Sequence, residues 1–256
     1  MTRDALVRCA VVAGFAALIV AAVALAPAAI HWSRSFDYAG QFGRGLALTA
    51  ALSAGALCLG LVFGGAAGLA RTSSSVALDQ AAFTYVELVR GTPFLVQLYI
   101  LYFCISHQLP PTVLGSSEAV IVGVVGLGLF SGASVAESVR AGVESIDRGQ
   151  WEAARSLGLS HSRTLFRVIL PQAVRRMIPP LTGEAVSLIK ESSLLSVIGV
   201  AEVTYHAKAL SSQGDTFAAY LPLAALYLLV TLPLSWLTRR LERHLGPRAP
   251  LPVSRL

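Results

Sequence analysis

Four polar side chains interrupt an apolar stretch late in the chain, and their spacing places three of them on one side of a helix. Glu184, Ser187 and Glu191 recur at intervals of three and four residues, and Lys190 directly precedes the last of them. At 100° per residue, the first three share one helical face. Carboxylates and hydroxyls arranged in this way can bind a cation or a hydrogen-bonding solute. The spacing therefore predicts a polar stripe along a solute pathway.

Ion pairing within the protein is the alternative for these residues. Ionisable groups inside a membrane helix are costly to insert and usually face a cavity or a partner of opposite charge. Lys190 could pair with a nearby carboxylate only to hold helices together, which leaves its role and that of Glu191 open. Glu184 has no basic residue on its own helical face, which favours contact with a solute.

No other set of residues is typical of a catalytic or metal site. Cys9, Cys58 and Cys104 lie apart in apolar stretches and form no ligand cluster, so they support neither a disulfide nor a metal. A phosphate-binding loop needs a lysine between glycine and serine or threonine, and neither Lys190 nor Lys208 follows a glycine. We therefore expect no catalytic residue, metal or cofactor on this chain.

The composition is typical of a membrane protein. Of the 256 residues, 55% are hydrophobic and only 13% are charged, whereas soluble domains have about a quarter charged residues. An apolar run of about 20 residues can cross a bilayer as a helix. We expect an all-α integral membrane protein with six transmembrane helices, roughly at 9–30, 46–70, 82–106, 119–139, 178–203 and 217–237.

The arginines and lysines predict the orientation, because cytoplasmic loops of membrane proteins carry an excess of them. If residues 151–173 are cytoplasmic, 15 of the 20 basic residues fall on the inner side and 3 on the outer side. Both chain ends are then cytoplasmic, and residues 107–118 and 206–215 are external. The net charge of +6 reflects this topology and requires no nucleic-acid partner.

The predicted spans divide the chain into three parts. Residues 1–40 form an N-terminal transmembrane helix with an external linker, residues 41–240 the main transmembrane domain, and residues 241–256 a cytoplasmic tail. The first apolar run also resembles a signal peptide. Its length, longer than is usual for such a peptide, favours a retained helix.

Two further patterns predict packing. Gly60, Gly64 and Gly68 stack on one helical face and allow a neighbouring backbone to approach closely. They suit a subunit interface or ordinary packing within the membrane, and we favour ordinary packing. Glu87 and Arg90 are one turn apart and can form an interfacial ion pair where the third span begins.

A polar stretch, WEAARSLGLSHSRTLFRVILPQA, separates two of the apolar runs at residues 151–173. It predicts a helix over 149–157, a left-handed stop at Gly158, and a second helix capped by Ser160 and running to about Leu170. Pro171 and the pair Pro179–Pro180 are expected to mark the return to the membrane. Such a hairpin suits docking into another protein's groove, although a loop lying on the membrane surface is the alternative.

The same stretch resembles the EAA loop of the permease subunits of ABC importers. That pattern is E-A-A, three residues, G, nine residues and I-x-L-P. Val168 replaces the isoleucine. The matching residues are Glu152, Ala153, Ala154, Gly158, Leu170 and Pro171.

Other stretches resemble the polar amino-acid subgroup of these permeases, which includes the histidine, glutamine and arginine types. They include YVELVRGTPFLVQL, GQWEAARSLGL and SLIKESSLLSVIGVAEV, and the resemblance covers about residues 41–243. Ser134 replaces a usual tyrosine, Glu191 and Ser192 replace Asp-Thr, and Gly183 replaces a frequent asparagine. The change at Gly183, beside Glu184, bears on which solute is carried.

The resemblance implies a type I ABC importer permease fold, here a five-helix core with an extra N-terminal helix, in a bacterial inner membrane. It implies a second permease subunit, identical or homologous, surrounding lipid and an extracytoplasmic substrate-binding protein. It also implies ATPase subunits that hold ATP and magnesium and dock on a coupling loop at about 149–171. The expected function is uptake of polar amino acids or related compounds. A permease for another small solute and a secondary transporter are the alternatives.

Overall fold

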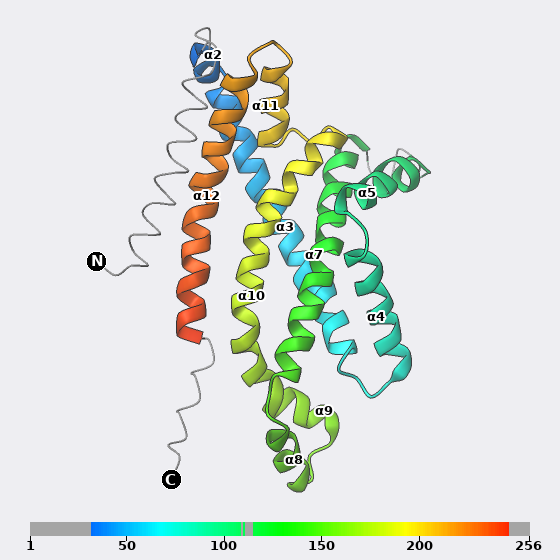
Figure 1. The fold of residues 1–256 in the computed structure, drawn as a ribbon. Helices are drawn as coiled ribbons and strands as arrows, with labels where there is room; N and C mark the ends of the chain where they lie inside the picture. The colour runs from blue at the N-terminus through cyan, green and yellow to red at the C-terminus, as the bar shows by residue number, and fades with distance from the viewer. Residues whose placement is uncertain (1–31, 109, 111–114, 246–256) are drawn as a thin grey trace, which may run out of the picture.

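Four long helices lie side by side in the computed structural model, which describes residues 32–108, 110 and 115–245 (Figure 1). They are α3 (Ala39–Ala70), α7 (Glu118–Glu144), α10 (Leu170–Glu191) and α12 (Thr216–Leu245). The described part of the chain contains helices and no strand. The first predicted span and the tail beyond residue 245 lie outside the described residues.

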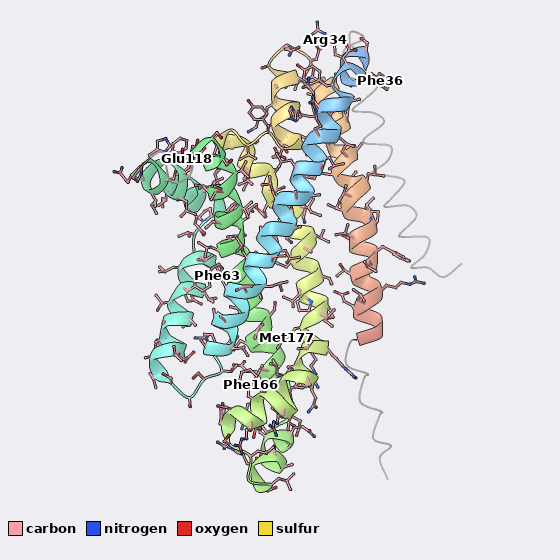
Figure 2. All side chains as sticks on the ribbon, turned by 180° about the vertical axis from the view of Figure 1, so that it is seen from behind. Arg34, Phe36, Phe63, Glu118, Phe166 and Met177 are labelled. Atoms are coloured by element: carbon pink, nitrogen blue, oxygen red, sulfur yellow. The ribbon has the colours of Figure 1, made fainter. Side chains whose placement is uncertain are left out.

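The two ends of the bundle carry different elements. Helices α8 (Arg148–Ser156) and α9 (His161–Thr164) project beyond the long helices at one end, here called the hairpin end. Helices α2 (Trp32–Asp37) and α11 (Val203–Ser211) lie at the opposite end, here called the α11 end. Figure 2 shows Arg34 and Phe36 at the α11 end and Phe166 near the hairpin end. The segments expected on opposite sides of the membrane thus lie at opposite ends.

Small residues bring α3 and α7 into close contact. A Cβ atom on Gly60 would lie 2.7 Å from Ser131 Oγ, and one on Gly64 would lie 2.6 Å from the Cβ of Val135. A Cβ on Gly68 would lie 2.5 Å from the Cβ of Val139. The structure therefore places all three glycines against a helix of the same chain, as ordinary packing within the bundle requires.

The third predicted span is not one helix. Helix α4 (Val76–Arg90) ends before Gly91. Beyond Pro93 follow α5 (Phe94–Tyr99), a π-helical segment (Ile100–Ile105) and a short 3₁₀ turn (Ser106–Gln108). The two halves meet at an angle of 101°. Pro93 has an extended backbone with ψ of 136°, and a proline disfavours helical geometry in the residue before it. The expectation of a continuous helix over 82–106 is therefore wrong.

The expected span at 178–203 is also divided, and it begins earlier. Helix α10 continues directly from a π-helical segment (Leu165–Ile169) and ends at Glu191, and a 3₁₀ segment (Ser192–Ile198) follows. Gly199 then adopts a left-handed backbone with φ of +86°. Such a residue ends a helix because only glycine adopts this conformation readily. Residues 178–203 therefore contain two helical segments and a turn.

The prolines near the hairpin do not stop the helix, contrary to expectation. Pro171 stands in the first turn of α10, where a missing N–H leaves no intrahelical hydrogen bond unmade. Pro179 and Pro180 lie inside α10. The helix continues through them while its neighbouring turns are held by buried side chains such as Ala173 and Met177. Packing outweighs the loss of two backbone hydrogen bonds here.

Three described helices are long and apolar enough to cross a membrane, at Ala39–Ala70, Gly115–Glu144 and Thr216–Glu242. The bent pair of α4 and the segment after it would make a fourth span. Helix α10 carries charged residues along its length, including Arg175, Arg176 and Glu184. The count of six transmembrane helices stays a prediction.

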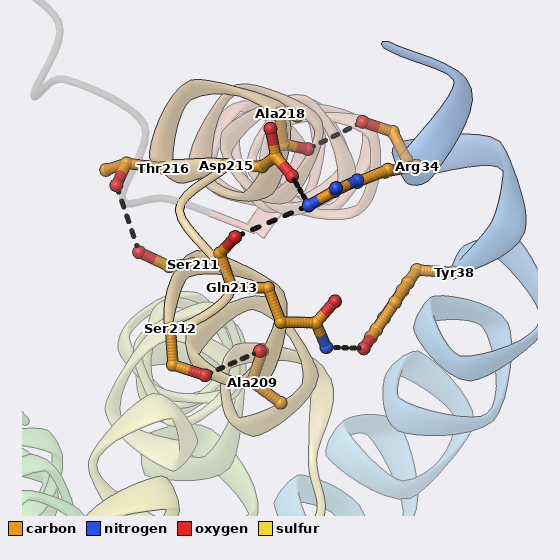
Figure 3. A network of polar contacts seen from close by, with 10 residues as sticks. Arg34, Tyr38, Ala209, Ser211, Ser212, Gln213, Asp215, Thr216 and Ala218 are labelled. Carbon is orange, nitrogen blue, oxygen red and sulfur yellow. Dashed lines mark hydrogen bonds and ion pairs between the residues drawn. The ribbon is translucent and has the colours of Figure 1, made fainter. Parts of the chain in front are cut away.

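Polar contacts join α2 to the turn between α11 and α12 at the α11 end (Figure 3). Arg34 forms an ion pair with Asp215 and donates to the Gln213 carbonyl at 3.3 Å. The Ser35 hydroxyl donates to the Ala218 carbonyl at 2.7 Å. These contacts fasten the start of α12 to the segment that precedes α3.

A buried carboxylate lies further inside the same end. Glu202 is fully buried and caps α11 by accepting a hydrogen bond from the Tyr205 N–H at 2.8 Å. The hydroxyls of Thr49 on α3 and Tyr227 on α12 also donate to it, at 3.3 and 3.4 Å. One carboxylate thus holds three helices, which satisfies the rule that a buried charge needs hydrogen-bond partners.

Candidate functional site: a cavity and a helical hairpin

A cavity of about 830 Å³ opens between α7 and α10. Arg90 of α4 and Glu242 of α12 also reach it. Most of its lining is polar or small, and it comes from two helices that pack against each other along the bundle. The lining residues from these two helices are Ser134, Glu137, Ser138, Ala141, Gly142, Ser145, Arg176, Pro179, Pro180, Gly183, Glu184 and Ser187.

The structure brings two members of the predicted polar stripe into this cavity. Glu184 and Ser187 line it, whereas Glu191 does not. The Glu184 carboxylate faces the hydroxyls of Ser131 and Ser134 on α7. Among the residues that the structure describes, Glu184 forms no ion pair. A carboxylate in this position can attract a cationic group that enters the cavity.

Lys190 lies outside this site. Lys190 is exposed, and it forms no ion pair with any residue that the structure describes. The alternative of an ion pair between Lys190 and a neighbouring carboxylate is therefore not seen among the described residues. Six residues separate Lys190 from Glu184, so at 100° per residue their side chains point about 120° apart around the helix.

The expected pairing of Glu87 with Arg90 is also not formed. Both residues are exposed, and the structure shows no ion pair between them. Arg90 instead turns toward the cavity, which Glu137 also lines. A pattern confined to one helix could not reveal this, because the cavity is made by other helices.

Glu137 and the serines of α7 are cavity residues that the sequence reasoning did not select. Glu137 pairs with Arg140, which also contacts Glu144 at 2.5 Å. Ser134 and Ser138 line the cavity four residues apart, which places them on one helical face. That periodicity was a usable signal.

Interactions between residues close in sequence shape the hairpin. Asp147 caps α8 by accepting from the Gly149 N–H at 2.7 Å. Gly158 has a φ of +78°, the left-handed conformation that the sequence predicts. Ser160 occupies the N-cap position of α9 but makes no side-chain hydrogen bond to the helix. The hairpin therefore turns on Gly158.

The motif residues of the hairpin divide between surface and interior. Ala154 is buried at 4% exposure and anchors α8 against the bundle, whereas Glu152, Ala153 and Pro171 are exposed. Leu157 is 81% exposed and Phe166 is 55% exposed, so the tip presents apolar side chains beyond the bundle (Figures 1 and 2). A projecting, partly apolar tip suits docking on another protein.

Comparison with known proteins decides the family. A family model described as "Binding-protein-dependent transport system inner membrane component" matches residues 56–247, most of the chain. The chain belongs to this family. Its hairpin, cavity and glycine-packed helix pair are therefore features of a binding-protein-dependent transport permease.

Several characterised relatives resemble this permease over most of their length. The glutamine transport system permease protein GlnP of Escherichia coli K12 is 36% identical over 215 residues, 84% of this chain and 97% of that protein. The L-cystine transport system permease protein TcyB of Bacillus subtilis 168 is 36% identical over 203 residues, 78% of this chain and 85% of that protein.

Solved structures agree with the fold of the permease. A crystal structure of an amino acid ABC transporter with histidines superposes with a TM-score of 0.75 at 36% identity, covering 84% of this chain and 99% of that one. An inward-facing structure of the MetNI methionine ABC transporter gives 0.66 at 18% identity, covering 80% and 96%. The expected all-α bundle of the ABC importer permease type is confirmed.

Proposed function

We propose that this chain is the transmembrane permease subunit of an ATP-driven importer of polar amino acids, and that the cavity between α7 and α10 is part of its solute pathway. The observation that carries the proposal is a half-buried carboxylate, Glu184, which lines a cavity of about 830 Å³ and has no ion pair in the described part of the chain. Relatives named for glutamine and cystine transport support an amino-acid cargo.

The charges around the cavity suit a zwitterion. Glu184 supplies a negative group on α10, and Arg90 and Arg176 supply positive groups. Arg176 also donates to the Ser145 carbonyl, and two further carboxylates line the cavity, Glu137, which pairs with Arg140, and Glu242. An amino acid carries an ammonium group and a carboxylate, which these side chains complement. Small residues such as Gly183 leave room for the cargo beside Glu184.

The hairpin is the coupling element in this proposal. It docks on an ATPase subunit through its projecting, partly apolar tip. That subunit supplies the ATP site, since this chain has no Gly-Lys-Ser or Gly-Lys-Thr sequence. The hairpin end then faces the cytoplasm of the bacterium, together with the end of α12. A second permease subunit, identical or homologous, completes the pathway, and a binding protein delivers cargo at the α11 end.

Transport by the assembled complex tests the proposal. The permease is reconstituted in liposomes with its ATPase and binding protein, and uptake of radiolabelled glutamine, arginine and cystine is followed with and without ATP. We expect uptake of at least one amino acid that depends on ATP, with maltose uptake at background. Uptake that follows an ion gradient and ignores ATP would show a secondary transporter. ATP-driven uptake of a sugar alone would show another solute class.

Substitution of Gly158 tests the coupling role of the hairpin. Valine at this position places a β-branched side chain in a left-handed backbone, which costs at least about 1 kcal/mol and distorts the turn. We expect Gly158→Val to reduce both ATPase co-purification and uptake. Asparagine tolerates this conformation, so Gly158→Asn should retain most of both. Normal co-purification and uptake in the valine variant would contradict the coupling role.

A further inference from the structure

A second groove, of about 630 Å³, lies at the hairpin end. Residues from four segments line it: the turn after α3, the end of α7, helix α8 and the start of α9. None of its lining residues belongs to the cavity between α7 and α10. Its polar, charged and aromatic lining residues are Thr72, Glu144, Arg148, Trp151, Arg155 and His161.

Helix α8 turns one face toward this groove. Arg148, Trp151 and Arg155 follow a spacing of three and four residues, which aligns them along the helix. Glu152, the first residue of the EAA motif, does not line the groove. The face that carries these two arginines is thus distinct from the motif residue at the tip.

The groove has unbalanced positive charge. Glu144 is the only carboxylate among its lining residues, and Arg140 already contacts it at 2.5 Å. The neighbouring Asp147 accepts a hydrogen bond from the Gly149 N–H. Within the described residues, neither Arg148 nor Arg155 forms an ion pair. Two guanidinium groups are therefore available to an anion, and their fork of donors matches a phosphate.

One lining residue of the groove, His161, has a buried nitrogen without a hydrogen-bond partner. His161 stacks on Trp151, with ring centroids 5.2 Å apart and an angle of 26° between the rings. Its Nε2 atom is buried and has no hydrogen-bond partner. Buried polar atoms in folded proteins are almost always hydrogen-bonded. The Nε2 atom of His161 is an exception to this rule beside the groove.

The position of the groove along the bundle identifies the kind of ligand. Two helices that are long and apolar enough to cross a membrane end at Ala70 and Glu144, and Thr72 and Ile146, two residues beyond these helix ends, line the groove. Side chains just beyond the apolar spans lie at the level of the lipid headgroups. Tryptophan is enriched at this level, and basic pockets at the ends of transmembrane helices bind anionic headgroups.

We propose that this groove binds the phosphate of an anionic phospholipid, with Arg148 and Arg155 as the phosphate ligands. Trp151 and His161 form the wall against which the headgroup lies. The site goes beyond the transport function proposed above and does not depend on which solute the permease carries. A lipid held here contacts α3, α7 and the hairpin together, so it stabilises the hairpin against the membrane helices.

Photo-crosslinking of the complete permease–ATPase complex in liposomes tests this site. The probes are phosphatidylglycerol and phosphatidylcholine that carry a photoreactive group near the headgroup. We expect roughly tenfold more label on the peptide containing Trp151 and His161 with the phosphatidylglycerol probe, and loss of this excess in Arg148→Gln/Arg155→Gln. If the double variant fails to assemble, the single variant Arg155→Gln, at an exposed position, takes its place. We expect it to lower the excess label roughly fivefold.

The matched control is Arg163→Gln/Arg167→Gln, which removes two exposed arginines of the same hairpin that do not line the groove. This pair should keep the excess label. Equal labelling by the two probes, or equal loss in both arginine pairs, would overturn the site and leave only a general surface charge. Labelling that appears only after the ATPase is removed would assign the groove to the protein partner. None of these readings depends on transport.

Discussion

Replacing Gly64 by leucine should abolish the folded permease. A Cβ atom at this position would overlap the carbonyl oxygen of Gly132 and lie 2.6 Å from the Cβ of Val135. Both obstacles are backbone or attached directly to it, so no flexible side chain can move aside. Overpacking of this kind costs roughly 3 kcal/mol or more, because the two helices must separate. The measurements are the yield of monodisperse protein in detergent and the midpoint of its thermal unfolding.

The neighbouring glycine on the same helix is the matched control. A Cβ on Gly65 would meet no atom within 4 Å, so Gly65→Leu adds the same bulk to α3 without touching α7. We expect this variant to match the unaltered protein in yield and unfolding midpoint. If the Gly64 and Gly65 variants both have the same midpoint of thermal unfolding as the unaltered protein, the close α3–α7 contact is not required.

Glu184→Gln should impair transport without disturbing assembly. The substitution keeps the size of the side chain and its capacity to form hydrogen bonds, but it removes the negative charge that faces the cavity. A hydrogen bond to a charged group contributes about 1.5–3 kcal/mol, so uptake should fall about tenfold or shift toward less cationic solutes. The measurements are uptake of several labelled amino acids and basal ATPase activity, which should stay near normal.

Glu191→Gln is the control for this variant, because Glu191 lies on the same helix and does not line the cavity. It should leave uptake and solute preference unchanged. Unchanged uptake and preference in Glu184→Gln would remove Glu184 from the pathway. A complex that dissociates when Glu184 is altered would instead assign the residue to helix packing.

Local features of the hairpin could be predicted from the sequence. Helix α8 spans Arg148–Ser156 against an expected 149–157, and Gly158 is left-handed as expected. Both depend on interactions among adjacent residues: a capping aspartate, a helix of alanines and charged residues, and a glycine that relieves backbone strain. Such signals act over a few residues, and they are readable without knowledge of the rest of the fold.

The arrangement of the cavity could not be predicted in this way. Arg90 and Glu137 come from different helices, and their approach depends on the 101° bend after α4 and on how α7 packs. Hydropathy over 82–106 does not reveal that bend, because it reports how apolar the chain is and not its direction. Proline was a better indicator at residue 93, where the chain breaks, than at 179 and 180, where neighbouring side chains hold the helix.

The adjacent prolines of α10 also make that helix unevenly stiff. The chain continues from α9 through the π-helical segment into α10 without a loop. The hairpin is therefore connected to α10 by continuous helix. Pro179 and Pro180 cannot donate hydrogen bonds to the carbonyls one turn earlier, and both residues line the cavity. The part of α10 that bends most easily is therefore at the cavity wall. A bend of about 5° there moves an arm of about 25 Å by about 2 Å at the hairpin, so small displacements at the tip and the width of the cavity are mechanically linked.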